Sequence, residues 1–150
     1  MDNLIYKYIH SNHFQIKLPL IENANFYLPK IAEEVPIICY LTKRPEIVRA
    51  GTMAWLTKYN FPIAPLIMKP NELPDNEGNQ WKSDFIQDYR DEPIGIIDDD
   101  KNLVNLLKRD GKIHYFLFGI ENYFVPALKV YPCVNWEILY KKYLTIKKDI

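Results

Sequence analysis

From residue 35 onward, short apolar runs alternate with amphipathic segments, and this alternation limits the folds open to the chain more than any other feature. The apolar runs are VPIICYL (35–41), APLIM (64–68), PIGII (93–97) and KIHYFLFGI (112–120). Continuous apolar runs are typical of strands that are covered on both faces. Helical patterns separate or follow them, at 45–60, 81–91, 101–111 and 135–148. The alternation predicts an α/β fold, a Rossmann-like three-layer sandwich with a mostly parallel sheet.

The first 34 residues follow this pattern less closely. NLIYKYIH (3–10) suits a short helix or a strand, and FQIKLPLI (14–21) alternates as a strand does, with Pro19 favouring an edge or an end. ENANFYLPKIAEE (22–34) predicts a helix that Pro29 kinks unless it lies near the start. A chain of 150 residues is long enough for one domain with a real core. We therefore expect a single α/β domain over residues 1–150, with 1–34 as an atypical N-terminal segment.

Charge and cysteine usage restrict the class of protein. Lys plus Arg and Asp plus Glu are equal at 19 each, so the chain has no overall basic field and nucleic-acid binding is not expected. Two cysteines lie far apart in sequence, and Cys39 falls in a predicted buried strand, which favours a reducing compartment over a disulfide scaffold. No signal peptide or long apolar run occurs, so we expect a cytoplasmic protein that does not enter membranes.

Three of the predicted elements have polar residues at one of their ends. Thr42 follows the strand 35–41, Lys82 lies in the first turn of the helix 81–91, and Asp98, Asp99 and Asp100 follow the strand 93–97. Functional groups in parallel α/β sheets collect beyond the carboxyl ends of the strands. A hydroxyl, an ammonium and carboxylates at that edge could surround a phosphate together with Mg²⁺. Arg44 could also hold an anion with two hydrogen bonds.

Each of these residues also has an ordinary structural interpretation. Thr42 can cap the helix that starts at Pro45, Lys82 can be a solvated helix residue, and Asp100 can be an N-cap. Arg44 can pair with Glu46 or another neighbouring acid. His10 and His13 form an H-x-x-H pair, but without a third ligand an ordinary surface is favoured.

The order of these residues resembles the haloacid dehalogenase-like (HAD) phosphohydrolase superfamily over roughly Pro36 to Gly119. The resemblance matches Thr42 to the family's second motif, Lys82 to its third, and Asp98 with Asp99 to its fourth. It implies that Thr42 and Lys82 hold the transferring phosphoryl group, that the two aspartates help to bind Mg²⁺, and that the ligand is phosphorylated.

The family's first motif, Asp-x-Asp, does not occur before Thr42. Asp2 is the only aspartate there, and the nearest substitute, Glu22, has Ala24 rather than an acid two positions on. The strand that carries this motif sits mid-sheet in the family, so it is missing or replaced here, either by FQIKLPLI (14–21) or by a partner chain. We therefore expect a phosphate and Mg²⁺ half-site without an identifiable nucleophile, inactive or weak alone. A non-catalytic binding or scaffold protein, as a homodimer, and one part of a split or truncated phosphatase remain alternatives.

Overall fold

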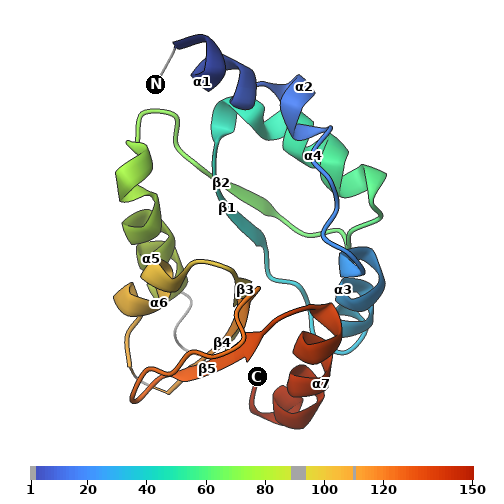
Figure 1. The fold of residues 1–150 in the computed structure, drawn as a ribbon, viewed down its shortest axis with the longest axis vertical. Coiled ribbons are helices and arrows are strands. Elements are labelled where there is room, and N and C mark those ends of the chain that lie inside the picture. Colours follow the sequence, from blue (N-terminus) through green and yellow to red (C-terminus); the bar gives the residue numbers. More distant parts are fainter. Residues whose placement is uncertain (1–2, 89–93, 110) are drawn as a thin grey trace. The chain divides into compact units, whose positions relative to one another are not determined.

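The computed structural model describes residues 3–88, 94–109 and 111–150 and is a mixed α/β structure with parallel strand pairing (Figure 1). It divides into two compact units, Met1–Gly78 and Asn79–Ile150. The expectation of an α/β fold with parallel strands is confirmed. The described strands form two separate sheets, one in each unit, and each unit is described in turn.

The first unit is a two-stranded parallel sheet with four helices. Strands β1 (Tyr40–Pro45) and β2 (Leu66–Lys69) pair with each other. The helices are α1 (Asn3–Ile9), α2 (Asn12–Gln15), α3 (Ala24–Ala32) and α4 (Arg49–Lys58), and two 3₁₀ turns are η1 (Glu46–Val48) and η2 (Asp75–Glu77). Its core contains Val48, Leu66 and Met68, against which Tyr40 and Leu56 pack.

Strand β1 begins later than the apolar run predicts. The run covers 35–41, yet pairing with β2 starts at Tyr40, whose N–H donates to the carbonyl of Pro65. Pro62 and Pro65 precede β2 and have no N–H to offer, so the chain before Tyr40 has no ladder to join. Cys39 therefore lies just outside the strand and is half-buried rather than in a covered strand.

The prediction of a strand at 14–21 is wrong. Helix α2 takes the first residues of this segment, and its last residues form no strand. The carbonyl of Leu18 accepts hydrogen bonds from Trp55 Nε1 on α4 at 2.8 Å and from Oη of Tyr59, the C-cap residue of α4, at 3.4 Å. Side chains of α4 thus use the backbone groups that a strand would pair, and this segment does not supply the missing mid-sheet strand.

Helix α2 packs closely on α4 through a glycine. The Gly51 N–H donates to Asn12 Oδ1 at 2.7 Å, and a Cβ at Gly51 would lie 2.6 Å from the Cα of Asn12. Glycine at this position lets the two helices approach closely. In the same unit, α3 keeps Pro29 inside it and buries Ala24, Leu28 and Ile31, as the sequence predicts for a helix over 22–34.

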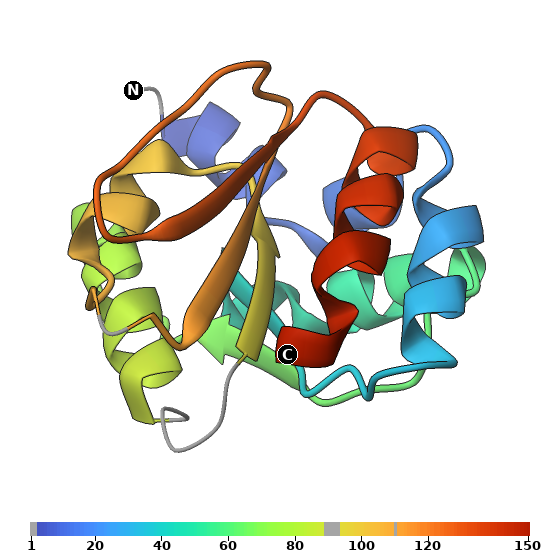
Figure 2. The ribbon, with the colours of Figure 1, turned by 90° about the horizontal axis from the view of Figure 1, so that it is seen from below.

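The second unit is a three-stranded parallel sheet in the order β3-β4-β5, drawn from yellow to dark orange in Figure 2. The strands are β3 (Ile94–Asp98), β4 (Ile113–Phe118) and β5 (Lys129–Cys133). The helices are α5 (Gly78–Asp88), α6 (Lys101–Leu106) and α7 (Trp136–Ile146), with a final 3₁₀ turn, η3 (Lys147–Asp149). The central strand β4 is buried from Ile113 to Leu117, as a doubly covered apolar run predicts.

Strand β5 was not predicted, because Pro132 made its segment resemble a loop. Proline is tolerated at an edge strand when its missing N–H faces away from the neighbour. Helix α6 is also shorter than expected. It ends at Leu106, and Gly111, with φ of 74°, lies beyond it in the left-handed conformation.

Two tryptophans contribute to packing in their units. Trp136 is buried at the start of α7, and Trp55 is half-buried on α4 with its indole N–H bonded to Leu18. None of the helices in the described part of the chain has the length and apolar character needed to span a membrane.

Candidate functional site

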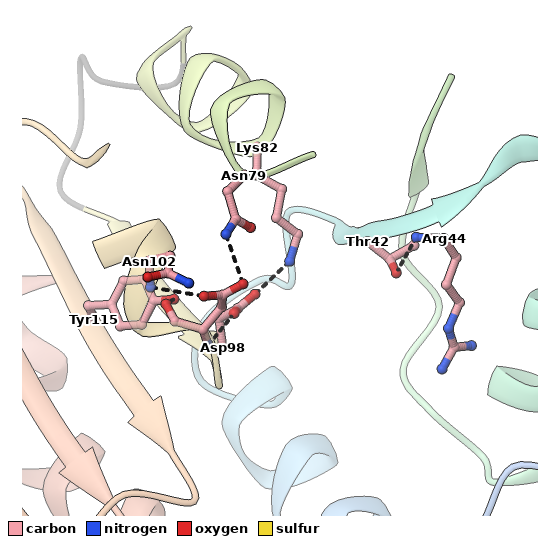
Figure 3. Close-up of polar contacts among 8 residues, drawn as sticks. Thr42, Arg44, Asn79, Lys82, Asp98, Asn102 and Tyr115 are labelled. Carbon is pink, nitrogen blue, oxygen red and sulfur yellow. Dashed lines mark hydrogen bonds and ion pairs between the residues drawn. The ribbon is translucent and has the colours of Figure 1, made fainter. Parts of the chain in front are cut away.

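A buried ion pair joins α5 to the carboxyl end of β3. Lys82 Nζ lies 2.6 Å from Asp98 Oδ2, and the two side chains are only 8% and 13% exposed (Figure 3). Because α5 begins at Gly78, Lys82 lies in its second turn rather than its first, which corrects the sequence prediction. Asp98 is the last residue of β3. The structure therefore brings together two of the residues that the sequence predicted at this edge.

The three consecutive aspartates have three different environments. Asp98 Oδ1 accepts the Asp100 N–H at 2.9 Å. Asp100 is the N-cap of α6 and accepts the Asn102 N–H at 2.9 Å, which confirms its structural interpretation. Asp99 is exposed. Repulsion among the three carboxylates is thus relieved by an ammonium at Asp98, by a helix amino end at Asp100 and by water at Asp99.

Two residues of this cluster were not found by sequence reasoning. Asn79 Nδ2 donates to Asp100 Oδ2 at 2.9 Å, and Asn79 Oδ1 is buried without a hydrogen-bond partner in the described structure. Asn79 precedes Lys82 by one helical turn, a spacing that places both on one face of α5 and could have indicated it. The Tyr115 hydroxyl donates to the Asp100 carbonyl at 3.3 Å.

Tyr115 shows how enclosed this cluster is. Burial first, and then the negative charge of Asp98, raise the pKa of the Tyr115 phenol far above its usual range. The residue is 1% exposed at the centre of β4. It therefore stays protonated as a hydrogen-bond donor, and its position in an apolar strand gave no sign of a polar role.

Thr42 and Arg44 belong to the first unit. Thr42 lies inside β1 and not beyond the strand. It pairs with Met68 of β2, and the register between the two strands shifts after it, between Thr42 and Pro45. Its Oγ1 accepts the Arg44 N–H at 3.2 Å, while the Ile47 N–H of η1 donates to Asn71 Oδ1 at 2.8 Å, so Thr42 is not the cap of the following helix. This bond two residues along the chain is a local hydroxyl-to-backbone turn.

Arg44 has a different partner from Glu46, with which its ordinary structural interpretation would pair it. Glu46 pairs with Arg49, whose Nε lies 2.6 Å from Glu46 Oε2. The Arg44 guanidinium instead lies 5.8 Å from the centroid of the Trp55 ring, a cation–π distance. Burial lowers the pKa of Arg44, although a guanidinium stays charged. A half-buried cation on an aromatic ring retains hydrogen-bond donors for an anion.

A second polar cluster lies at the amino end of the sheet in the second unit. His114 is 1% exposed, its Nδ1 is 3.1 Å from the Tyr131 hydroxyl, and Lys129 Nζ is 3.2 Å from its Nε2. Burial and the Lys129 charge lower the pKa of His114, with Asp149 acting in the opposite direction. An ammonium can only donate, so Nε2 accepts and the neutral ring carries its proton on Nδ1.

In the part of the chain that the structure describes, the metal-ligating side chains form no compact cluster. Among residues 3–88, 94–109 and 111–150, no group of three or more His, Cys, Asp or Glu side chains is placed to hold a metal ion. His10 stacks on Tyr6 with ring centroids 4.1 Å apart, and His13 is exposed. At the end of β3 the candidate ligands are the carboxylates of Asp98 and Asp99.

Comparisons with protein families, with curated proteins and with solved structures return no match to this chain.

Proposed function

We propose that the chain is a HAD-like phosphohydrolase-type protein that retains a phosphate and Mg²⁺ half-site and lacks an identifiable nucleophile. In the second unit, Lys82 supplies a phosphate-binding group and Asp98 with Asp99 supply the metal ligands, while Thr42 and Arg44 of the first unit are proposed as phosphate-binding groups from the order of the sequence alone. The protein is inactive, or weakly active, alone. A HAD-like core whose first motif strand is missing or replaced is part of this proposal.

The observation that carries the proposal is the buried Lys82–Asp98 pair at the carboxyl end of β3. Removing two charges from water is costly, and a buried ion pair is weak evidence for stability alone. A parallel sheet concentrates ligand sites at this edge, and helix α6 begins there with its N–H groups directed toward the same end. The pair is therefore better explained by a retained binding function than by stability.

The donor set suits Mg²⁺ in its chemistry. Mg²⁺ prefers hard oxygen ligands, and Asp98 and Asp99 provide carboxylates, while Asn79 Oδ1 nearby is a buried oxygen without a partner. Asp98 is shared with Lys82, so the ammonium would compete with the ion for one carboxylate oxygen. Mg²⁺ would offset the negative charge of a bound phosphate.

The lack of an identifiable nucleophile in the sequence supports the proposal that the protein is inactive, or weakly active, alone. No Asp-x-Asp precedes Thr42 in the sequence, and Glu22 is an exposed turn residue before α3. Covalent phosphoryl transfer needs an attacking group, and positioning alone does not replace it.

One part of a split phosphatase is a second candidate function, which the small sheets favour. A two-stranded parallel sheet is marginal alone, and parallel strands normally lie within larger covered sheets. A complementing chain that adds a strand would enlarge such a small sheet and would cover its strands.

The proposal is tested by a calorimetric titration of Mg²⁺ and orthovanadate, an analogue of the transferring phosphoryl group. We expect vanadate to bind the native protein only with Mg²⁺ present, and Asp98→Asn to weaken this binding at least about tenfold, roughly the cost of one charged ligand. Glu137→Gln removes an exposed carboxylate on α7 and serves as the matched control. Heat of binding that is absent, or equal in native and Asp98→Asn proteins, would refute the half-site.

A further inference from the structure

The two edges of the sheet in the second unit differ in how their backbone groups are satisfied. The Gly119 N–H donates to the Cys133 carbonyl, so Cys133 of β5 faces β4, while Val130 and Pro132 face the outer edge. The Val130 N–H is bonded to the Leu128 carbonyl, and Pro132 has no N–H. The carbonyl of Pro132 accepts a hydrogen bond from Lys142 of α7. The outer edge of β5 is therefore closed to a further strand.

Among residues 3–88, 94–109 and 111–150, no such protection is seen at the edge of β3. The Ile94 N–H donates to the Lys112 carbonyl, so Ile94, Ile96 and Asp98 face β4. Gly95 and Ile97 then direct their N–H and C=O groups outward, and within the described residues no strand pairs with that side of β3. Gly95 is exposed and Ile97 is half-buried. An apolar edge without proline, lysine or a bulge is a template for another strand.

The sequence of β3 is complementary to itself in the antiparallel direction. A two-fold axis at Ile96 places Gly95 of each copy opposite Ile97 of the other, and these are the outward-facing residues. Such pairs exchange both of their N–H···O=C bonds. The missing side chain of Gly95 leaves room for the Ile97 side chain on the same face.

The charges are compatible with this register. Asp98 lies opposite Ile94 of the other copy and not opposite a second carboxylate. The two Asp98 residues are then about 13 Å apart along the strands, from a rise of about 3.3 Å per residue. This separation exceeds the Debye length of about 8 Å at physiological ionic strength, so their repulsion is screened. A parallel arrangement of two identical strands would bring the carboxylates side by side.

We propose that β3 is a dimerisation strand through which two copies of this chain join antiparallel at Ile96 and merge their three-stranded sheets into one. The interface is isologous, with each copy supplying the same edge. Its two Gly95–Ile97 pairs supply main-chain hydrogen bonds and set the register. The dimer and the proposed phosphate site can fail independently, because vanadate binding tests the site and the molecular mass in solution tests the dimer.

The test is sedimentation of the 150-residue chain over a range of concentrations. We expect the native chain to sediment as a dimer that dissociates on dilution. Ile97→Pro removes the outward N–H from both copies and leaves the β3–β4 ladder intact, so the dimer dissociation constant should rise roughly tenfold or more. Ile97→Val keeps the N–H and should sediment as the native chain does.

Hydrogen exchange of the native protein gives a second measurement that does not depend on a variant's folding. The Gly95 and Ile97 amides should exchange more slowly at high protein concentration than at low concentration, while the Ile96 amide is protected at both. A native monomer at all concentrations would overturn the proposal. So would a dimer whose Gly95 and Ile97 amides exchange freely, since a different surface would then join the copies.

Discussion

Replacing Lys82 with methionine is expected to lower the free energy of unfolding by about 3–5 kcal/mol, the usual cost of breaking a buried ion pair from one side. The change leaves Asp98 buried beside α5 without the Lys82 ammonium, although the Asp100 N–H still donates to it. Urea unfolding followed by circular dichroism measures the effect. Asp98→Asn alone should also destabilise, because it leaves the Lys82 charge unpaired.

An exposed pair in the same unit provides the control for this prediction. Lys141 and Glu137 on α7 lie 2.6 Å apart, as Lys82 and Asp98 do, but their side chains are 65% and 56% exposed. Lys141→Met should cost less than about 0.5 kcal/mol, as for other solvent-exposed helical pairs. Equal effects of Lys82→Met and Lys141→Met would show that the Lys82–Asp98 pair is solvated, contrary to its burial here.

Leu139→Ala is expected to lower the free energy of unfolding by about 2–5 kcal/mol, because it opens a cavity where α7 enters the core of the second unit. Leu139 is fully buried on this helix. Leu144→Ala makes the same chemical change on α7, at a residue that is 42% exposed, and should cost less than about 1 kcal/mol. Thermal unfolding of both variants measures the two losses in stability. Similar losses for Leu139→Ala and Leu144→Ala would contradict the burial of Leu139.

The sequence predicted the second unit better than the first. The apolar runs at β3 and β4 are continuous and end at turn residues, so their pattern is decided locally. Strand β5 depends on its pairing with β4. Its Pro132 argues against a strand unless the segment is known to lie at the edge of a sheet. Which strand lies at an edge is a property of the assembled sheet, and no local pattern contains it.

The first unit shows why alternation of apolar residues is not sufficient. Residues 14–21 alternate as a strand does, but the carbonyl of Leu18 accepts hydrogen bonds from Trp55 on α4 and from Tyr59 at the C-cap of that helix, about forty residues further along the chain. The start of β1 was misplaced for a similar reason, since Pro62 and Pro65 in the partner segment decide where pairing begins. Contacts that are distant in sequence override the local preference in both cases.

The candidate site was predicted in part. Lys82 and Asp98 were expected at one sheet edge because carboxyl ends of parallel strands lie together, and the structure places them in contact. Asn79 and Tyr115 were missed because their roles depend on the position of Asp100, which the sequence does not reveal. The expected grouping of Thr42 and Arg44 with these residues, together with the HAD-like family itself, stays a prediction.

The measurement that tests the central proposal most directly is turnover of a generic aryl phosphate by the 150-residue chain with Mg²⁺, with Asp98→Asn in parallel. A protein that retains the half-site without a nucleophile should release no product above the Mg²⁺ buffer in either form. Turnover by the native protein that Asp98→Asn abolishes would contradict this account. It would mean that the chain contains a nucleophile, and Glu22 would be the first residue to replace.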